Sequence, residues 1–143
     1  MGLIQSLYGK KIFLDTAPLI HFIEESSDYV QKLNELFLPQ NNCQFVTSVI
    51  TLSEVLVMPL REKKPRLAEQ YEDILIQAEN FDIYEINIQI AKESAILRAK
   101  YTIKTPDAIQ LATAKYCSVD YFLTNDLRLK SVKDLNIITL NEL

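Results

Sequence analysis

The stretch that decides the fold is Lys11-Ile12-Phe13-Leu14-Asp15-Thr16, in which a short apolar run ends at a carboxylate. An apolar run of this length is typical of a buried strand. The arrangement recurs near the other end of the chain, where Tyr121-Phe122-Leu123 is followed by Thr124-Asn125-Asp126. Both stretches therefore predict a buried strand that is followed closely by an acidic residue.

Outward from these two stretches, apolar strand-like runs alternate with longer helix-like segments. The predicted strands are residues 11–14, 44–46, 81–86, 120–123 and 136–139. The predicted helices are residues 16–24, 27–38, 49–58, 67–80, 88–101 and 106–116, and Pro39 and Pro59 are expected to end the second and third. Strands separated by helices favour right-handed crossovers, and therefore an α/β fold with a parallel sheet covered on both faces.

Composition narrows the class of protein. The chain has 143 residues, of which 48% are apolar, and this is sufficient for one domain with a substantial core. Its net charge of −4 argues against a protein that binds nucleic acid simply by being basic. Cys43 and Cys117 form no CxxC pair, which favours a reducing cytoplasm. The most apolar tract, residues 45–60, contains Glu54 and is too short to span a bilayer, so no membrane association is expected.

Four acidic residues stand where an apolar element usually carries another residue type. They are Asp15, Glu54, Asp107 and Asp126. Asp15 and Asp126 follow predicted strands, and in open α/β sheets polar sites gather outside the carboxyl ends of the strands, where the strand order reverses. Glu54 and Asp107 belong to helices that can point into the same crevice. We therefore expect the four carboxylates to meet there.

Each acid also has a purely structural explanation. Asp15 or Thr16 can cap the helix that follows. Thr105-Pro106-Asp107 reads as an N-cap, a first-turn proline and an acid favoured by the helix dipole. Asn125-Asp126 suits a turn. Glu54 differs because its helix is apolar nearly all round, which predicts a buried carboxylate, and burying such a charge without a cation is costly.

The acids lie in the stretches Phe13-Leu14-Asp15-Thr16, Ser53-Glu54, residues 105–114 and Leu123-Thr124-Asn125-Asp126. In order and spacing these stretches resemble the acidic motifs of PIN-domain ribonucleases, and the chain is similar in size to VapC-type toxins of prokaryotic toxin–antitoxin modules. The resemblance implies one PIN-like domain over residues 1–143, with three α/β/α layers and a mostly parallel central sheet. It also implies Mg²⁺- or Mn²⁺-dependent RNA cleavage, a homodimer and a small antitoxin protein as partner.

The chemistry of the acids agrees with that resemblance. Hydrolysis of a phosphodiester needs an activated water, charge stabilisation on the phosphoryl oxygens and help for the leaving oxygen, and one or two divalent ions can supply all three. Hard ions such as Mg²⁺ take carboxylate and water oxygens. Asp15, Glu54, Asp107 and Asp126 are therefore the predicted catalytic and metal-binding residues. A metal-free ribonuclease with two histidines is excluded, because the chain has only His21.

Residues beside the acids have predicted supporting roles. Thr16, Thr124 and Asn125 are expected to orient the carboxylates or to contact phosphate. Basic residues form three clusters, which are Arg61, Lys63, Lys64 and Arg66; Arg98, Lys100 and Lys104; and Arg128, Lys130 and Lys133. Lys104 and Arg128 flank Asp107 and Asp126 and are expected to bind RNA phosphates, although a solvated surface run is the alternative for each cluster.

The acids should also affect stability. Ionised carboxylates in one crevice repel each other, which predicts at least one raised pKa. The same repulsion predicts a higher melting temperature for metal-free Asp126→Asn.

Two other classes of protein stay open. The first is a non-catalytic PIN-fold interaction module, against which the presence of all four carboxylates weighs. The second is an acidic α/β phosphotransfer domain. A phosphatase of the haloacid-dehalogenase kind needs an Asp two residues after Asp15, where this chain has Ala17. A receiver domain needs an acidic pair before its first helix and a late strand that ends in Lys, and neither is present.

Overall fold

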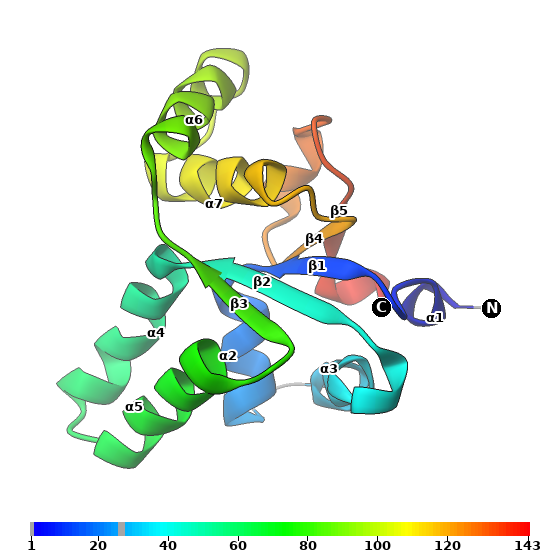
Figure 1. The fold of residues 1–143 in the computed structure, drawn as a ribbon, viewed down its shortest axis with the longest axis vertical. Coiled ribbons are helices and arrows are strands. Elements are labelled where there is room, and N and C mark those ends of the chain that lie inside the picture. The colour runs from blue at the N-terminus through cyan, green and yellow to red at the C-terminus, as the bar shows by residue number, and fades with distance from the viewer. Residues whose placement is uncertain (1, 26–27) are drawn as a thin grey trace.

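Five parallel strands form one central sheet in the computed structural model, which describes residues 2–25 and 28–143 (Figure 1). The strands are β1 Lys11–Leu14, β2 Gln44–Ser48, β3 Phe81–Tyr84, β4 Tyr121–Thr124 and β5 Ile137–Thr139. Their spatial order is β3-β2-β1-β4-β5, and each neighbouring pair is parallel. The predicted α/β fold with a parallel sheet is confirmed.

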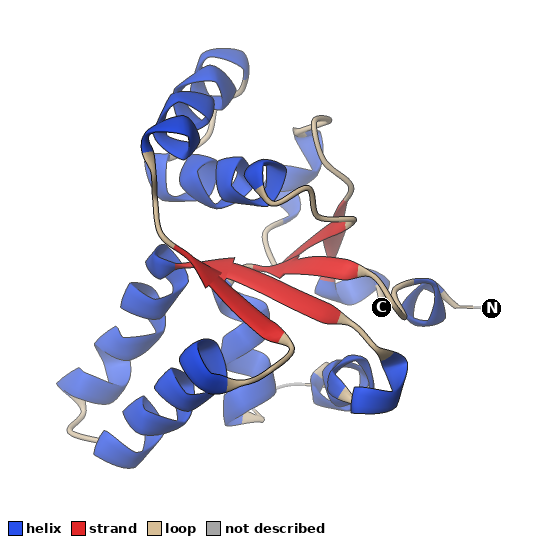
Figure 2. Ribbon diagram, in the orientation of Figure 1, coloured by secondary structure: helices blue, strands red, loops and turns tan. Residues whose placement is uncertain are grey.

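Helices cover both faces of this sheet, which gives the expected three layers (Figures 1 and 2). The helices are α1 Leu3–Ser6, α2 Thr16–Glu24, α3 Val30–Phe37, α4 Val49–Arg61, α5 Pro65–Glu72, α6 Ile88–Lys100 and α7 Thr105–Tyr116. One face packs against α2, α3, α4 and α5, and the other against α6 and α7. None of the described helices combines the length and apolarity needed to cross a membrane.

Strand side chains alternate between two hydrophobic cores, one on each face. Ile12 and Leu14 point into the core beneath α2 to α5, whereas Phe13 points into the core beneath α6 and α7. Phe13 stacks on Phe122 of β4, with ring centroids 5.0 Å apart. All four side chains are fully buried, and burial on both faces explains why these strands are continuous apolar runs in the sequence.

The strand order reverses at β1. From β1 the chain proceeds to β2 and β3 on one side and later returns to β4 and β5 on the other. The carboxyl ends of β1 and β4 are therefore adjacent, and the Asp15 N–H donates to the Leu123 carbonyl oxygen at 3.0 Å. This is the position at which open α/β sheets form a crevice.

Several predicted helix boundaries were wrong. Pro59 lies inside α4 instead of ending it, because a proline near the last turn removes only one helical hydrogen bond and the Glu62 N–H still reaches the Met58 carbonyl at 2.8 Å. The predicted helix 27–38 begins at Val30, and residue 27 lies outside the described part of the chain. The predicted helix 67–80 starts earlier, at Pro65, and its second half, Asp73–Gln77, is π-helical.

The start of α7 also differs from the prediction. Thr105 was expected to be the N-cap, but Lys104 occupies that position with an extended backbone. The Lys104 carbonyl accepts the first helical hydrogen bond from the Ala108 N–H at 3.0 Å. Thr105 is thus the first helical residue, and Asp107 stays in the first turn.

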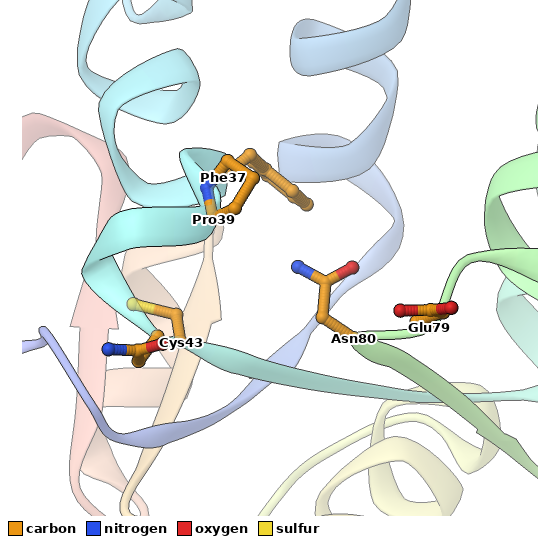
Figure 3. Close-up of a pocket in the computed structure, with 6 residues that line it drawn as sticks. Phe37, Pro39, Cys43, Glu79 and Asn80 are labelled. Carbon is orange, nitrogen blue, oxygen red and sulfur yellow. The ribbon is translucent and has the colours of Figure 1, made fainter.

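A pocket lies at the amino ends of β2 and β3, on the edge of the sheet opposite to the acids (Figure 3). Phe37, Cys43, Glu79 and Asn80 are among the residues that line it. Cys43 and Cys117 are both free and buried, which agrees with the absence of a predicted disulfide. Burial raises the pKa of both thiols, so at neutral pH they are protonated core residues.

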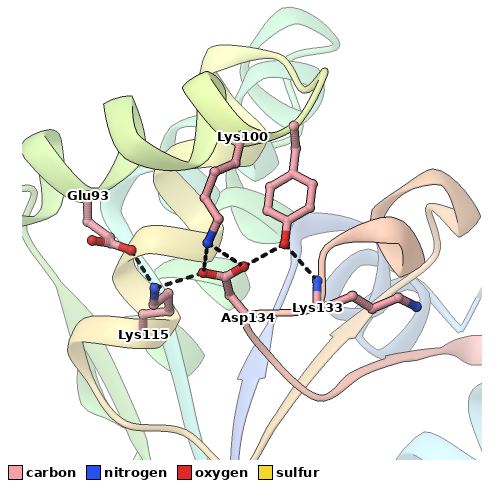
Figure 4. Close-up of polar contacts among 6 residues, drawn as sticks. Glu93, Lys100, Lys115, Lys133 and Asp134 are labelled. Atoms are coloured by element: carbon pink, nitrogen blue, oxygen red, sulfur yellow. Dashed lines mark hydrogen bonds and ion pairs between the residues drawn. The ribbon is translucent and has the colours of Figure 1, made fainter.

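Asp134 anchors the segment between β4 and β5 to the α6–α7 layer (Figure 4). Its carboxylate accepts hydrogen bonds from Tyr101 Oη at 2.6 Å, Lys100 Nζ at 3.0 Å and Lys115 Nζ at 3.1 Å. Lys115 also pairs with Glu93 of α6 at 2.5 Å. Hydrogen bonds from Tyr101 and Lys100 hold the pKa of Asp134 well below its usual range. The segment that carries Asp126 is therefore fixed at its far end.

Replacing Asp134 by Asn should destabilise the protein in a pH-dependent manner. Because the folded-state pKa is depressed, the stabilisation is complete above the unfolded-state pKa of about 4 and is lost as pH falls below it. We expect Asp134→Asn to lower the free energy of unfolding at pH 7 by about 1 to 3 kcal/mol. Urea unfolding of both proteins from pH 7 to pH 3 measures this. A difference that does not shrink below pH 4 would rule out the charge as its source.

Candidate functional site

Asp15 is held by a hydrogen bond to each of its two carboxylate oxygens. Its Oδ1 accepts from the Thr16 N–H at 2.9 Å and so caps α2, and its Oδ2 accepts from Thr124 Oγ1 at 2.8 Å. Burial raises the pKa of Asp15, although these two hydrogen bonds oppose the shift, and the charges of Asp107 and Glu54 add to it. The carboxylate is thus oriented by two donors, and no Lys or Arg within residues 2–25 and 28–143 forms an ion pair with it.

Glu54 does not have the environment that the sequence suggested. It was expected to be buried in an apolar helix, but its side chain is exposed, because α4 buries only one face, through Thr51, Val55 and Pro59. Its Oε1 accepts from Thr16 Oγ1 at 2.7 Å. The hydroxyl of Thr16 therefore links Glu54 to the residue that follows Asp15, and the argument from burial no longer supports a cation at Glu54.

Asp126 is the one acid of the four with an ion pair in the described part of the chain. Its Oδ1 accepts from the Arg128 N–H and Nε, both at 3.0 Å, and its Oδ2 accepts from Arg128 Nη2 at 2.8 Å. These contacts lower the pKa of Asp126. Asp126 also caps the 3₁₀ helix Leu127–Ser131, as a turn residue would, and its N–H donates to Thr124 Oγ1 at 3.1 Å.

Asp107 faces the same region from the first turn of α7 and is half-buried. Burial is the main cause of its raised pKa, and the neighbouring charge of Asp126 raises it further, while Arg128 and Lys104 oppose the shift. The expectation of a raised pKa among the acids is therefore met at Asp15 and Asp107. The pKa of Asp126 is lowered instead, because Arg128 donates hydrogen bonds to its carboxylate.

Two pockets flank Asp126. One is lined by Asp15, Thr124, Asn125, Asp126 and Arg128, so it includes all three residues of the Thr124-Asn125-Asp126 turn. The other is lined on its polar side by Asp107 and Asp126 and by three basic residues, which are Arg98, Lys104 and Arg128. Sequence reasoning placed Arg98 in a basic cluster with Lys100 and Lys104 but assigned RNA binding only to Lys104 and Arg128, because those two residues flank the acids directly. The second pocket therefore joins acidic and basic side chains.

The four acids are connected but do not form a closed ligand set. Within residues 2–25 and 28–143, no three His, Cys, Asp or Glu side chains are gathered closely enough to hold a metal ion. Thr16 links Asp15 to Glu54 by donating its N–H to the first and its hydroxyl to the second. The Thr124 hydroxyl links Asp15 to the backbone of Asp126, and Asp107 interacts with Asp126 and Glu54 through charge. The oxygens available are nevertheless the donors that hard divalent cations prefer.

Comparison with known proteins identifies the family. The family model for the PIN domain matches residues 12–135, which is most of the chain. This chain belongs to the PIN-domain family. The resemblance drawn from the acidic motifs is confirmed, since all four acids lie within the matched residues. A comparison with curated protein sequences found no significant match.

Solved structures with the same fold include several toxin–antitoxin proteins. A toxin–antitoxin complex from Klebsiella pneumoniae is 28% identical with a TM-score of 0.70, and the match covers 92% of this chain and 99% of that one. VapBC2 from Rickettsia felis, bound to a promoter DNA fragment, is 19% identical with a TM-score of 0.72, covering 90% and 98%. VapC20 from Mycobacterium tuberculosis, a sarcin-ricin loop cleaving toxin, is 14% identical with a TM-score of 0.66, covering 84% and 93%.

The pKa of Asp107 is raised and that of Asp126 is lowered, so replacing each by Asn should change the melting temperature in opposite directions. In EDTA at pH 7, Asp107→Asn should raise the melting temperature by a few degrees, because it removes a half-buried charge that lies beside Asp126. Asp126→Asn should lower it, because it breaks the pair with Arg128. This replaces the sequence-based expectation that Asp126→Asn stabilises. Thermal melts of the three proteins measure both effects, and a shift of the same sign in both variants would contradict the charge assignment.

Proposed function

We propose that this PIN-domain protein is a metal-dependent endoribonuclease and acts in the cytoplasm as the toxin of a toxin–antitoxin pair. The observation that carries the proposal is the state of Asp15. Its carboxylate is oriented by Thr124 and the Thr16 N–H, its pKa is raised, and among the described residues no Lys or Arg is paired with it, with Glu54 or with Asp107. Membership of the PIN family and the toxin fold supports the same function.

Asp15, Glu54, Asp107 and Asp126 would hold one or two Mg²⁺ or Mn²⁺ ions. The fit rests on donor chemistry, because carboxylate oxygens without a protein cation are the ligands that these ions take. When bound, such an ion supplies an activated water and stabilises charge on the phosphoryl oxygens. Asp126 would share its carboxylate with Arg128, so we expect it to be the weakest donor of the four.

The protein's own side chains have distinct roles in this proposal. Thr124 and Thr16 donate to Asp15 and Glu54 and keep their oxygens turned toward the crevice. Asn125, which is exposed in the same pocket, would contact phosphate. Lys104, Arg128 and Arg98 line the adjoining pocket and would bind the RNA backbone beside the scissile bond. In-line hydrolysis there leaves a 5′-phosphate and a 3′-hydroxyl.

The proposed partners are an RNA substrate, a small antitoxin protein and a second copy of the chain in a homodimer. The toxin–antitoxin complex from Klebsiella pneumoniae, which shares the fold at 28% identity, supports the antitoxin. An adjacent reading frame that encodes a small DNA-binding protein would support it further. Copurification of the two products, followed by mass determination of the complex, tests the antitoxin and the homodimer together.

Loss of a single carboxylate should abolish cleavage. Asp15→Asn and Asp107→Asn keep the shape of each side chain but remove the charge that holds a divalent ion, so both should lose metal-dependent cleavage of RNA while they stay folded. The assay incubates partner-free protein with total RNA in Mn²⁺, Mg²⁺ or EDTA and maps the cut ends. Asp120→Asn, which changes an exposed acid at the opposite edge of the sheet, is the matched control. Wild-type rates in either site variant would refute the assignment.

Basic residues of the second pocket should affect binding more than chemistry. Lys104→Ala and Arg98→Ala should weaken RNA binding and reduce the slope of log affinity against log salt by about 1 each, because each phosphate contact releases counterions. The cleavage rate at saturating RNA should change much less. Arg66→Ala, at the start of α5 and outside both pockets that flank Asp126, is the control. An unchanged salt slope in both pocket variants would show that Lys104 and Arg98 do not contact phosphate and are ordinary solvated surface residues.

A further inference from the structure

A buried chain of hydrogen bonds joins the three elements that carry Asp15, Glu54 and Asp107. Its side chains are at most 2% exposed, and they are Thr47 and Ser48 of β2, Thr51 of α4 and Gln110 of α7. None of them is one of the acids. Buried polar side chains in an otherwise apolar interior need a reason, because each must find partners or lose stability.

Gln110 is the centre of this chain. Its Oε1 accepts a hydrogen bond from the Ser48 hydroxyl, and its Nε2 donates to Thr51 Oγ1 at 2.6 Å. The hydroxyl oxygens of Thr51 and Thr47 are 2.8 Å apart, and Thr47 Oγ1 lies 2.8 Å from the Leu14 carbonyl oxygen. The bonds therefore run without a break from Ser48 to the backbone at the end of β1.

The direction of each hydrogen bond follows from the proton count. A carbonyl can only accept, so Thr47 donates its single proton to it, Thr51 donates to Thr47, and the Thr51 oxygen accepts from the Gln110 amide. On the other side, Ser48 donates to Gln110 and accepts from the Ile50 N–H at 3.1 Å. Because only this set of donors and acceptors is consistent, the Gln110 amide oxygen must face Ser48 and its nitrogen must face Thr51. Hydrogen bonds that form such a chain in a buried setting strengthen one another.

The ends of this chain lie next to the acids. Leu14 directly precedes Asp15, and Thr51 lies one helical turn before Glu54 on α4. Gln110 lies one turn after Asp107 on α7. The two helices belong to opposite layers of the fold (Figure 1), so the hydrogen bonds cross the carboxyl edge of β2 and tie both layers to β1.

We propose that Gln110 is a positioning residue: through Ser48 and Thr51 it sets the separation of Asp107 and Glu54 on either side of Asp15, and thereby the affinity of these acids for the divalent cation that they would hold. This inference rests on the proposed function. It assigns to Gln110 no contact with RNA or with the reacting atoms. The effect is geometric, because donors on two helix layers can share an ion only if the layers keep a fixed distance.

A matched residue shows what a purely local role looks like. Thr113 is fully buried on the same helix, one turn after Gln110, and its hydroxyl donates to the Ile109 carbonyl oxygen at 2.7 Å. That bond stays within α7 and joins no other element. Thr113→Val therefore removes a buried hydroxyl from the same helix without uncoupling the layers.

The test compares Gln110→Leu and Thr51→Val with Thr51→Ser and Thr113→Val. Mn²⁺ binding by titration calorimetry, kcat and KM for RNA, and the melting temperature are measured for each. Gln110→Leu and Thr51→Val should lose about 10- to 100-fold in Mn²⁺ affinity or kcat, as is usual when a group that orients a metal ligand is removed. KM for RNA should stay within about twofold, because the phosphate-binding side chains are unchanged. Thr51→Ser, which keeps the hydroxyl, should restore both values.

Each outcome bears on one hypothesis. If Gln110→Leu and Thr51→Val bind Mn²⁺ and turn over RNA like Thr113→Val, with only a lower melting temperature, the positioning role is overturned while the proposed function stands. If Gln110→Leu does not fold, the Thr51→Val and Thr51→Ser pair decides the question. If wild type itself neither binds Mn²⁺ nor cleaves RNA, the proposed function fails, and the positioning role fails with it.

Discussion

The hydrogen bond from Thr124 to Asp15 joins β4 to β1 at the point where the strand order of the sheet reverses, and the rest of the site depends on this junction. Parallel strands put their carboxyl ends on one edge, so every element that follows a strand begins there. Asp15 uses one oxygen to cap α2 and the other to accept from β4. A residue that satisfies the local helix and the neighbouring strand at once has no freedom to turn away from the crevice.

The distribution of positive charge divides this edge into two parts. Asp15 and Glu54 are contacted by threonine hydroxyls, which orient a carboxylate without neutralising it. Asp126 is contacted by Arg128, and Lys104 and Arg98 line the pocket beside it. A polyanion such as RNA is attracted to the second part and repelled by the first. For a phosphate of RNA to approach Asp15 and Glu54, a small cation would have to offset their negative charge. The proposed RNA-binding path therefore requires the proposed metal ion.

Most of the framework was predictable because it follows from hydrophobic patterning. The strand at residues 11–14 and the helix at residues 16–24 were located to the residue, and the crevice at the ends of β1 and β4 followed from their topology. The acids themselves stood out as polar residues at strand ends. What patterning could not give was the environment of each side chain, since burial depends on which face of a helix meets the sheet. Glu54 shows this, because its helix is apolar in sequence but exposes the face that carries it.

The residues that sequence reasoning missed share one property, which is that their partners are distant in the chain. Gln110 bonds to Ser48 and Thr51 about sixty residues earlier, and Asp134 bonds to Lys100 and Lys115 on two different helices. A polar residue within an apolar helix has no local signal that distinguishes a buried network from a surface position. Such pairings are set only when the layers assemble, so they belong to tertiary structure and could not be read from a single sequence.

The two polar assemblies beside the site should respond differently to solvent. The Gln110 assembly is buried and uncharged, so salt does not screen it and pH does not titrate it. The Asp134 assembly joins a carboxylate that is 12% exposed to lysines that are 31% and 52% exposed, and pairs of this kind weaken as ionic strength rises. The first assembly holds the helices that carry Glu54 and Asp107, and the second holds the segment that carries Asp126 and Arg128. The hydrogen bonds between α4 and α7 are therefore expected to be insensitive to salt and pH, whereas the contacts that anchor the segment after Asp126 and Arg128 should weaken as ionic strength rises.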